Sequence, residues 1–386
     1  MEKIFVLGGD GFCGWPTALH LAESGHEVVI LDDLSRRKID IDLGVQSLTP
    51  INTIDRRLSI WNQNKSNKIK FIHCDIANDY HRFVEILLKE KPDTIIHFAE
   101  QRAAPYSMKT EKTRRYTVSN NISTTNNVLV AITDNKLNIH LVHLGTMGVY
   151  GYSSAGLKIP EGYLDVKIEL PSNDMIDETI LYPTNPGSIY HMTKSMDQIM
   201  FAFYAKNYGI RITDLHQGIV WGIETEETKN DLGLINRFDY DGDYGTVLNR
   251  FITQAALKYP LTVHGTGGQT RAFIHIKDTV NCIRLACENP PLNGEKVKIR
   301  NQVTETHRVR DLAKLISDKT GATIAVIENP RKEAVENELD VSNDSFLNLG
   351  LNPTTLDEGL IDDVFSMALR YSDRVDLQLI PCASKW

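Results

Sequence analysis

Two short patterns in the 386-residue sequence carry side chains that could do chemistry together. Tyr190 and Lys194 are four residues apart, so on a helix they would lie on one face. A nearby ammonium group favours the phenolate form of a tyrosine, which can then act as a base near neutral pH. Thr146 follows a strand-like segment and could hydrogen-bond the hydroxyl group that Tyr190 deprotonates. These residues predict proton removal from an alcohol.

The second pattern is a glycine-rich loop that follows the apolar segment 4–7 and precedes a helical pattern. Its glycines have the spacing GxxGxxG, and glycine is needed where a backbone turns sharply and approaches a pyrophosphate closely. The start of the following helix offers unpaired N–H groups and a positive dipole end to phosphates. We therefore expect a dinucleotide to contact the loop residues Gly8, Gly11, Phe12, Cys13 and Gly14.

An acidic residue at the end of the next strand-like segment selects the dinucleotide. Asp32, with Asp33 beside it, would accept hydrogen bonds from the adenosine ribose and repel a 2′-phosphate, which predicts NAD as the cofactor. Arg36 and Arg37 could instead pair with the 2′-phosphate of NADP. Because Asp32 is present, we favour a solvated loop for these arginines, and we keep Arg36 among the candidate cofactor contacts.

The elements that must position these residues follow from the pattern of apolar segments. Strand-like segments alternate with helical patterns and lie at 4–7, 27–31, 69–73, 94–98 and 139–144. Strands separated by helices pair in parallel, and near-continuous apolar strands are covered on both faces. The sequence therefore predicts an α/β fold with a Rossmann-type doubly wound parallel sheet. A polar insertion at 35–67 and a long loop at 152–187 interrupt the alternation, and long loops are usually lids or binding loops.

The pattern loosens after about residue 222, which indicates a second, smaller mixed α/β lobe that binds the substrate. We expect the NAD-binding domain to comprise residues 1–221 and about 262–282. The substrate lobe would then comprise about 222–261 and 283–386. Ligands of such sheets bind at the carboxyl ends of the strands, so the two lobes would enclose the site.

Composition excludes several classes of function. The 42 Lys and Arg against 50 Asp and Glu give a net charge of −8, which argues against a nucleic-acid partner. No apolar run approaches the roughly 18 residues that span a membrane, so we expect no membrane insertion, and the first residues leave no room for a targeting peptide. Five scattered cysteines without a CxxC pair indicate reduced thiols in a cytoplasmic protein and no metal site.

Further segments of the sequence, together with the two patterns above, resemble those of a known protein family. Residues 148–151, Tyr182 with Pro183, and the segment 271–278 accompany the glycine loop and the YxxxK pattern. Together these residues resemble the extended short-chain dehydrogenase/reductase family, the sugar-nucleotide epimerases and dehydratases. The resemblance implies a bound NAD, a nucleotide-sugar substrate and a homodimer formed through two helices, one of which carries Tyr190.

A longer set of segments is similar to one branch of that family, which joins sulfite to UDP-glucose. The shared segments are 97–108, 144–148, 190–191, 214–218, 248–251, 260–263, 267–271, 329–334 and 373–376. The resemblance covers essentially the whole chain. It implies that UDP-glucose and sulfite give UDP-sulfoquinovose by NAD-dependent oxidation at C4, loss of water across C5 and C6, addition of sulfite at C6, and re-reduction at C4.

The resemblance also implies binding residues. Phe98 would lie against the cofactor, and Asp75, with Ile76 beside it, would contact the adenine or instead cap a helix. The residues expected to contact substrate are Gln101, Arg102, Thr146, Gln217, Asn249, Thr262, Arg271, Arg331 and Glu333.

Four of these positions carry more specific expectations. Arg102 would bind sulfite, or alternatively form a salt bridge. Arg271 and Arg331 would clamp the diphosphate, since guanidinium groups bind phosphate in a bidentate manner. Asn249 could instead be structural.

At the positions where related enzymes carry the acid and base for water loss, this sequence has other residues. Related dehydratases place an Asp-Glu pair directly after the threonine, whereas Met147 and Gly148 stand here. His191 is the candidate for proton transfer or a sulfite contact, and its alternative is a histidine on the helix surface. Within the same fold the alternatives are a UDP-glucose 4-epimerase or a 4,6-dehydratase; a non-catalytic NAD-binding regulator is a more distant one.

Overall fold

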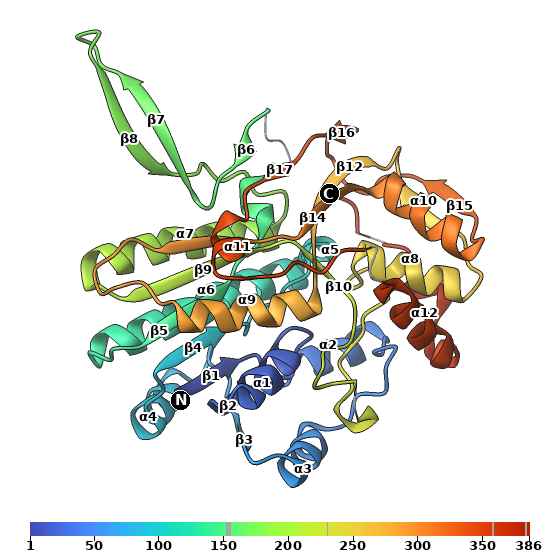
Figure 1. The fold of residues 1–386 in the computed structure, drawn as a ribbon, viewed down its shortest axis with the longest axis horizontal. Helices are drawn as coiled ribbons and strands as arrows, with labels where there is room; N and C mark the ends of the chain where they lie inside the picture. The colour runs from blue at the N-terminus through green and yellow to red at the C-terminus, as the bar shows by residue number, and fades with distance from the viewer. Residues whose placement is uncertain (152–155, 230, 357–358, 383) are drawn as a thin grey trace.

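The core of the chain is a seven-stranded parallel sheet (Figure 1). The computed structural model describes residues 1–151, 156–229, 231–356, 359–382 and 384–386. The order of strands across the sheet is β13-β9-β5-β4-β1-β2-β3, and every neighbouring pair is parallel. Their bounds are β1 Lys3–Leu7, β2 Glu27–Asp32, β3 Ile69–His73, β4 Thr94–His97, β5 His140–Leu144, β9 Arg211–Gln217 and β13 Lys298–Gln302. This confirms the predicted Rossmann-type fold.

Both faces of this sheet are covered by helices, as the apolar strands predict. Ile4 and Val6 of β1 point into a core that also contains Trp15. Phe5 and Leu7 point into the opposite core. The helices of this part are α1 Gly14–Glu23, α2 Ser35–Leu43, α3 Ile54–Asn64, α4 Tyr80–Glu90, α5 Ala104–Lys109, α6 Glu111–Asp134, α7 Ile189–Tyr208 and α9 Ile276–Glu288. The polar insertion at 35–67 therefore contains two helices, α2 and α3.

The long loop predicted at 152–187 contains regular structure. Its residues 152–155 lie outside the described residues. Beyond them the chain forms the short strand β6 (Lys158–Ile159) and an antiparallel hairpin of β7 (Tyr163–Glu169) and β8 (Met175–Leu181). Figure 1 shows this hairpin extending away from the rest of the chain at the upper left.

The strands outside the large sheet form several small sheets. Strands β10 (Ile219–Trp221), β12 (Gly268–His275) and β14 (Glu305–Arg308) form one sheet, with parallel and antiparallel pairs. The remaining elements are β11 Leu261–His264, β15 Ile324–Ile327, β16 Glu336–Asn337, β17 Asp340–Val341, α8 Val247–Ala256, α10 Val309–Thr320, α11 Asp344–Asn348 and α12 Leu360–Arg370, with the 3-10 helices η1 Met147–Tyr150, η2 Leu232–Leu234, η3 Ser372–Arg374 and η4 Leu377–Leu379.

The predicted division into two lobes stays a prediction, although one strand bears on its boundary. β13 pairs with β9 in the large sheet, from Lys298 opposite Thr213 to Gln302 opposite Gln217. The sequence pattern assigned all of 283–386 to the substrate lobe. The chain therefore returns to the large sheet within that range before it completes the smaller lobe.

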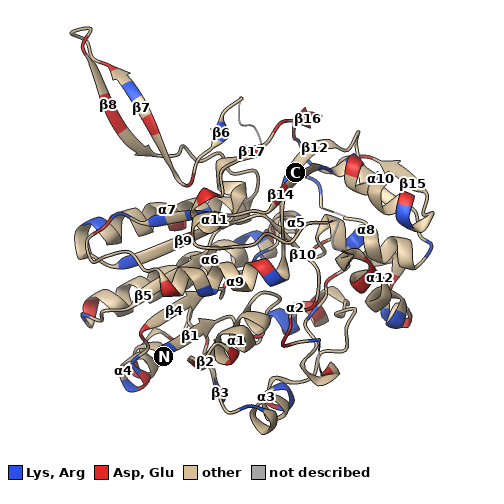
Figure 2. Ribbon diagram, in the orientation of Figure 1, with Lys and Arg blue, Asp and Glu red and all other residues tan. Residues whose placement is uncertain are grey.

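Figure 2 shows basic and acidic residues interspersed over the helices of both parts and on the β7–β8 hairpin. Among the described residues, no helix has the length and apolar character needed to cross a membrane.

Candidate active site

One cavity runs along the carboxyl edge of the large sheet and continues between it and the smaller sheets. It contains the point where the strand order reverses, between β1 and β4, which is where ligands bind in sheets of this kind. Every predicted cofactor residue lines it, and so does every predicted catalytic and substrate residue except Asn249. Asn249 instead faces the protein interior and accepts a hydrogen bond from the Gly222 N–H at 3.0 Å, so its position is structural.

The glycine loop leaves room that side chains would fill. A Cβ atom on Gly14 would lie 2.2 Å from the carbonyl oxygen of Gly8, and one on Gly8 would lie 2.7 Å from the Phe98 carbonyl carbon. Gly8 also has a φ of +80°, which favours glycine. Because α1 begins at Gly14, the positive end of its dipole faces this cradle. The loop therefore fits the pyrophosphate of a dinucleotide.

Asp32 lies at the end of β2 in the place that selects NAD. Its carboxylate accepts hydrogen bonds from the backbone N–H groups of Asp10 at 2.9 Å and Leu34 at 2.7 Å. Burial, with the nearby negative charge of Asp10, raises the pKa of Asp32 to about 7. A carboxyl group at this pKa can accept or donate hydrogen bonds to ribose hydroxyls.

The prediction that the two arginines after β2 lie in a solvated loop is wrong. Arg37 binds both oxygens of Asp10, at 2.5 and 2.9 Å. Arg36 binds Asp40 and, at 3.0 Å, Asp239. The positive charges of Arg36 and Arg37 are thus already paired with carboxylates. They are not free to bind the 2′-phosphate of NADP, which agrees with a preference for NAD.

Asp75 does not cap a helix. Its carboxylate accepts hydrogen bonds from the backbone and side-chain N–H groups of Asn78, at 3.1 and 2.9 Å. The residue that caps α4 is Asp79. Asp75 and Ile76 both line the cavity, as the adenine interpretation requires.

Tyr190 and Thr146 come together at the centre of the cavity. Ser188 caps α7 by accepting the His191 N–H at 3.2 Å, and the Tyr190 N–H is held by the Ser107 hydroxyl at 3.2 Å. The phenol of Tyr190 hydrogen-bonds the hydroxyl of Thr146. Burial raises the pKa of Tyr190 to about 12, and the positive charge of Lys194 acts in the opposite direction.

Lys194 is buried beneath Tyr190 and has several partners. Its ammonium donates to the Leu144 carbonyl oxygen at 2.8 Å. It also lies 2.9 Å from a Glu100 carboxylate oxygen and 2.9 Å from His143 Nε2. Burial by itself would lower the pKa of Lys194, but the negative charges of Glu100, Tyr190 and Asp197 together outweigh it, so the pKa is raised. Lys194 therefore remains protonated at neutral pH.

His191 is buried, so the helix-surface alternative is wrong. It packs against Gly148, and a Cβ atom on that glycine would lie 2.2 Å from the imidazole Cδ2. The imidazole Nδ1 lies 3.2 Å from the Ser188 hydroxyl. Burial, reinforced by the positive charges of Arg331 and Arg271, lowers the pKa of His191 to about 3. The imidazole is therefore neutral at pH 7 and can accept a proton.

Arg102 belongs to a cluster of paired charged side chains. It donates to Asp239 at 2.6 Å, and Asp239 also receives Arg36 and Arg237. The cluster also contains Asp40, which binds Arg36 and Arg237, and the buried Asp241, whose charge acts on Arg36. Gln101, next to Arg102, is buried and donates to the Ala103 carbonyl oxygen at 3.0 Å, so it supports the loop that carries Arg102.

The cavity is also lined by the predicted substrate residues Gln217, Thr262, Arg271, Arg331 and Glu333. Arg271 is bound by Glu333, and Arg331 lies over the Trp386 ring, with 5.0 Å from its guanidinium carbon to the ring centroid. Other predicted residues have polar partners as well, with Thr262 bonded to Gln254 at 2.7 Å and Gln217 to Thr279 at 3.3 Å. Both guanidinium groups line the cavity, where an incoming diphosphate can bind them.

Two residues of the site have no predicted role in the sequence. Tyr244 lines the cavity and lies under Arg36, with 3.6 Å from the guanidinium carbon to the ring centroid. Glu100 lies in the shared segment 97–108, but its pairing with Lys194 follows only from the fold. A carboxylate directly after a strand that ends at the cofactor is the signal that would have suggested it.

Comparison with known proteins places the chain in a family. Residues 4–299 match the NAD dependent epimerase/dehydratase family. A "UDP-sulfoquinovose synthase, chloroplastic" from Spinacia oleracea is 43% identical over 390 residues, covering 100% of this chain and 79% of that protein. A "UDP-sulfoquinovose synthase" from Sulfolobus acidocaldarius is 39% identical over 356 residues, covering 91% of this chain and 88% of that protein.

Solved structures show the same fold at lower identity. A UDP-glucose 4-epimerase from Thermotoga maritima, solved with UDP-glucose, has a TM-score of 0.69 and 20% identity, with 96% of this chain and 99% of that chain covered. A UDP-glucose 4-epimerase from Thermus thermophilus, solved with NAD, has a TM-score of 0.66 and 19% identity, with 97% and 100% covered. The chain belongs to the NAD dependent epimerase/dehydratase family and, within it, to the UDP-sulfoquinovose synthases.

Proposed function

We propose that this enzyme joins sulfite to C6 of UDP-glucose and that its own side chains move the protons at C4, C5 and the C6 oxygen. The observation that carries the proposal is that Thr146, Tyr190 and Lys194 meet a glycine cradle for NAD on one side and an arginine-rich cavity on the other. NAD, when bound, supplies a hydride acceptor and donor for C4.

Tyr190 moves the proton at C4. Burial raises the pKa of Tyr190, but the ammonium of Lys194 favours its phenolate, which would take the proton from the C4 hydroxyl while Thr146 holds that hydroxyl in place. The resulting ketone makes the hydrogen on C5 acidic. Neutral Tyr190 then donates a hydrogen bond to the ketone oxygen, and it returns its proton when C4 is reduced again.

His191 would move the proton between C5 and the leaving oxygen. Its neutral imidazole accepts the C5 proton and passes it to the C6 hydroxyl, which leaves as water. The diphosphate of the substrate would pair with Arg331 and Arg271, the two charges that hold the pKa of His191 low, so substrate binding makes the imidazole a stronger base. Hydrogen sulfite then forms the C6–S bond through its sulfur lone pair, and its proton ends on C5.

Sulfite itself would be held by the cluster around Arg102. Arg102 and the neighbouring guanidinium groups of Arg36 and Arg237 offer N–H donors that suit a small anion. The Arg102 side chain is 33% exposed, so it can turn from Asp239 toward a ligand.

Mass spectrometry of the enzyme incubated with UDP-glucose, with and without sulfite, tests the proposal. We expect a sulfonated sugar nucleotide only when sulfite is present. UDP-galactose formed without sulfite would instead identify a 4-epimerase. Tyr190→Phe should lower turnover by at least about 10³-fold, whereas Tyr204→Phe, a matched change on the same helix outside the cavity, should leave it unchanged.

We also propose a homodimer in the cytoplasm. The α7 helix that carries Tyr190 exposes a stripe of apolar side chains, with Ile199 62% and Phe203 53% exposed, as a helix-to-helix contact requires. All five cysteines are free thiols, which suits a reducing compartment. Light scattering should give twice the mass of one chain, and Phe203→Glu should give a single chain; an unchanged mass would contradict this contact.

A further inference from the structure

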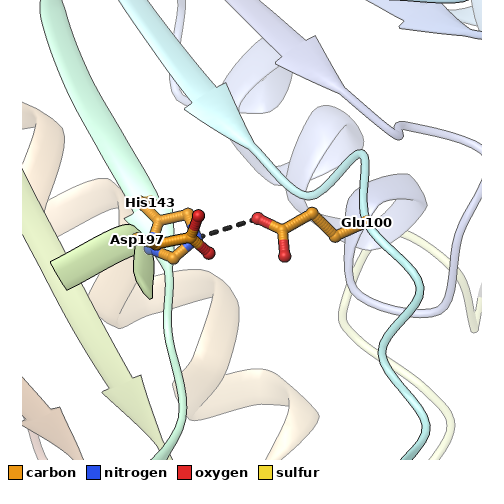
Figure 3. A group of neighbouring side chains, drawn as sticks. All are labelled: Glu100, His143 and Asp197. Carbon is orange, nitrogen blue, oxygen red and sulfur yellow. Dashed lines mark hydrogen bonds and ion pairs between the residues drawn. The ribbon is translucent and has the colours of Figure 1, made fainter. Parts of the chain in front are cut away.

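A buried group of charged side chains lies directly beneath Lys194, and no step above uses it. Figure 3 shows its three members Glu100, His143 and Asp197. Their side chains are at most 2% exposed. They are of the types that bind metal ions, but the cation that contacts two of them is the ammonium of Lys194.

Glu100 uses its two oxygens for two different cationic groups. One oxygen lies 2.9 Å from the Lys194 ammonium. The other lies 3.0 Å from His143 Nε2, which itself is 2.9 Å from the same ammonium. The opposite nitrogen of His143 lies 2.8 Å from Asp214. The imidazole is thus placed between two carboxylates, the arrangement that favours its doubly protonated form.

We propose that Glu100 is a positioning residue for the reaction proposed above, because its carboxylate bridges Lys194 and His143 and so holds two adjacent cations beneath Tyr190. Without that carboxylate, a protonated His143 would repel the ammonium from the place where it faces Tyr190. Two positive charges this close repel each other by several kcal/mol even at an effective dielectric constant of about 20. Loss of the bridge would therefore act on turnover through Lys194.

The other charged groups around the bridge support this charge state. Burial lowers the pKa of His97, next to Glu100, to about 3, so that imidazole is neutral. Burial would lower the pKa of His143, and Lys194 would too, but Asp214 and Glu100 raise it to about 9. Asp197, which lies 3.5 Å from His143, has its pKa raised by burial to about 8.

A further neighbour fixes the orientation of this arrangement from the far side. Asp214, on β9, also accepts from His216 at 3.0 Å, and these two imidazoles hold the pKa of the Asp214 carboxyl below its usual range against the effect of burial. His216 in turn lies 2.6 Å from the Tyr150 hydroxyl. The His143 ring therefore cannot turn away from Glu100 and Lys194 without breaking this chain.

The pH dependence of Glu100→Gln tests the proposal. The ratio of its turnover number to that of the wild-type holoenzyme should rise at least 10-fold between pH 6 and pH 9, because His143 loses its proton and stops repelling Lys194. Ionisation of Asp197 over the same range acts in the same direction. A ratio that is constant with pH would mean that Glu100 only supports the fold. A ratio that falls would mean that Glu100 acts on Tyr190 directly, and either result overturns the proposal.

Three further variants sharpen the test. Glu305→Gln is the matched control, since that carboxylate also pairs with an imidazole, that of His307 at 2.8 Å, but lies outside the cavity and does not contact Lys194; the ratio of its turnover number to that of the wild type should be constant with pH. Glu100→Gln combined with His143→Gln removes the second cation and should restore a constant ratio. Should Glu100→Gln fail to fold, Glu100→Asp retains the charge and should show lower turnover with a constant ratio; a rising ratio would overturn the proposal.

A readout independent of turnover separates this inference from the proposed function. Titration of the His143 imidazole by NMR in the holoenzyme should give a markedly lower pKa in Glu100→Gln than in the wild type. The same His143 pKa in Glu100→Gln and in the wild type would overturn the proposed bridge, even if the enzyme is active. Wild-type enzyme that forms no sulfonated product would refute the proposed function, while the titration would still decide whether the bridge exists.

Discussion

Replacing Gly148 with alanine should show that the missing Cβ atom at this position makes the site for His191. The new Cβ would lie 2.2 Å from the imidazole Cδ2, whereas ordinary contacts begin at 3.4 Å. The ring must therefore move by about 3.4 − 2.2 = 1.2 Å, or η1 must move away from α7. Since His191 is buried, neither movement is free, and overpacking of this kind costs about 1–3 kcal/mol of folding free energy.

The expected effect on catalysis is larger than the effect on stability. Misplacing a reacting group by about 1 Å can cost on the order of 10²-fold in rate. We expect Gly148→Ala to lower the turnover number by about that factor in the assay with UDP-glucose and sulfite. Affinity for NAD should change by less than about twofold, because the glycine cradle lies elsewhere in the cavity.

A matched glycine on the other side of the same imidazole provides the control. A Cβ atom on Gly187 would lie 3.9 Å from His191 Nδ1, an ordinary contact, so Gly187→Ala should retain wild-type turnover. The decisive comparison is a double-mutant cycle: Gly148→Ala should add nothing to the loss caused by His191→Ala. Additive losses would show that Gly148 acts independently of His191 and would refute the reasoning.

Two further predictions concern stability. Asp10→Asn should lower the free energy of unfolding by about 3–5 kcal/mol in denaturant titrations, because it leaves Arg57, whose side chain is 0% exposed, without its carboxylate 2.9 Å away; a loss below about 1 kcal/mol would contradict this. His143 gains its raised pKa of about 9 on folding, so it adds stability below pH 6.5 that is lost as the pH rises toward 9. The difference in unfolding free energy between wild type and His143→Gln should therefore shrink by on the order of 3 kcal/mol from pH 6 to pH 9.5, and a difference independent of pH would show that His143 folds uncharged.

Local patterns were sufficient to predict the parts of the site that depend on the backbone. The glycine spacing and the acid after the second strand predict a cradle and a ribose partner, and both lie where expected because strand, loop and helix are adjacent in sequence. The YxxxK pair is likewise local, since both residues lie on α7. The predicted strand segments agree with β1 to β5 to within one residue at each end.

Long-range packing accounts for what the sequence could not show. His191 is buried only because Gly148, in a different element, has no side chain. Arg36 and Arg37 follow a strand in a polar segment, and nothing nearby indicates that Asp239 and Asp10 bind them. Asn249 falls in a segment shared with the family, but the face of α8 that carries it points inward. Each of these outcomes depends on a partner that the fold brings from elsewhere.

Under the proposed function, the site must admit a sulfur nucleophile that is itself an anion, so the charges around the leaving group matter. The dehydratases that this chain resembles place two carboxyl groups after the catalytic threonine, and Met147 and Gly148 stand at those positions here. A carboxylate 4 Å from an incoming anion would oppose it by about 1 kcal/mol in water and about 4 kcal/mol at an effective dielectric constant near 20. A neutral His191 in the space beside Gly148 can move the C5 proton without that penalty. Under the proposed function, the absence of that carboxylate pair removes this repulsion, and Arg102, which lines the same cavity, can then attract sulfite.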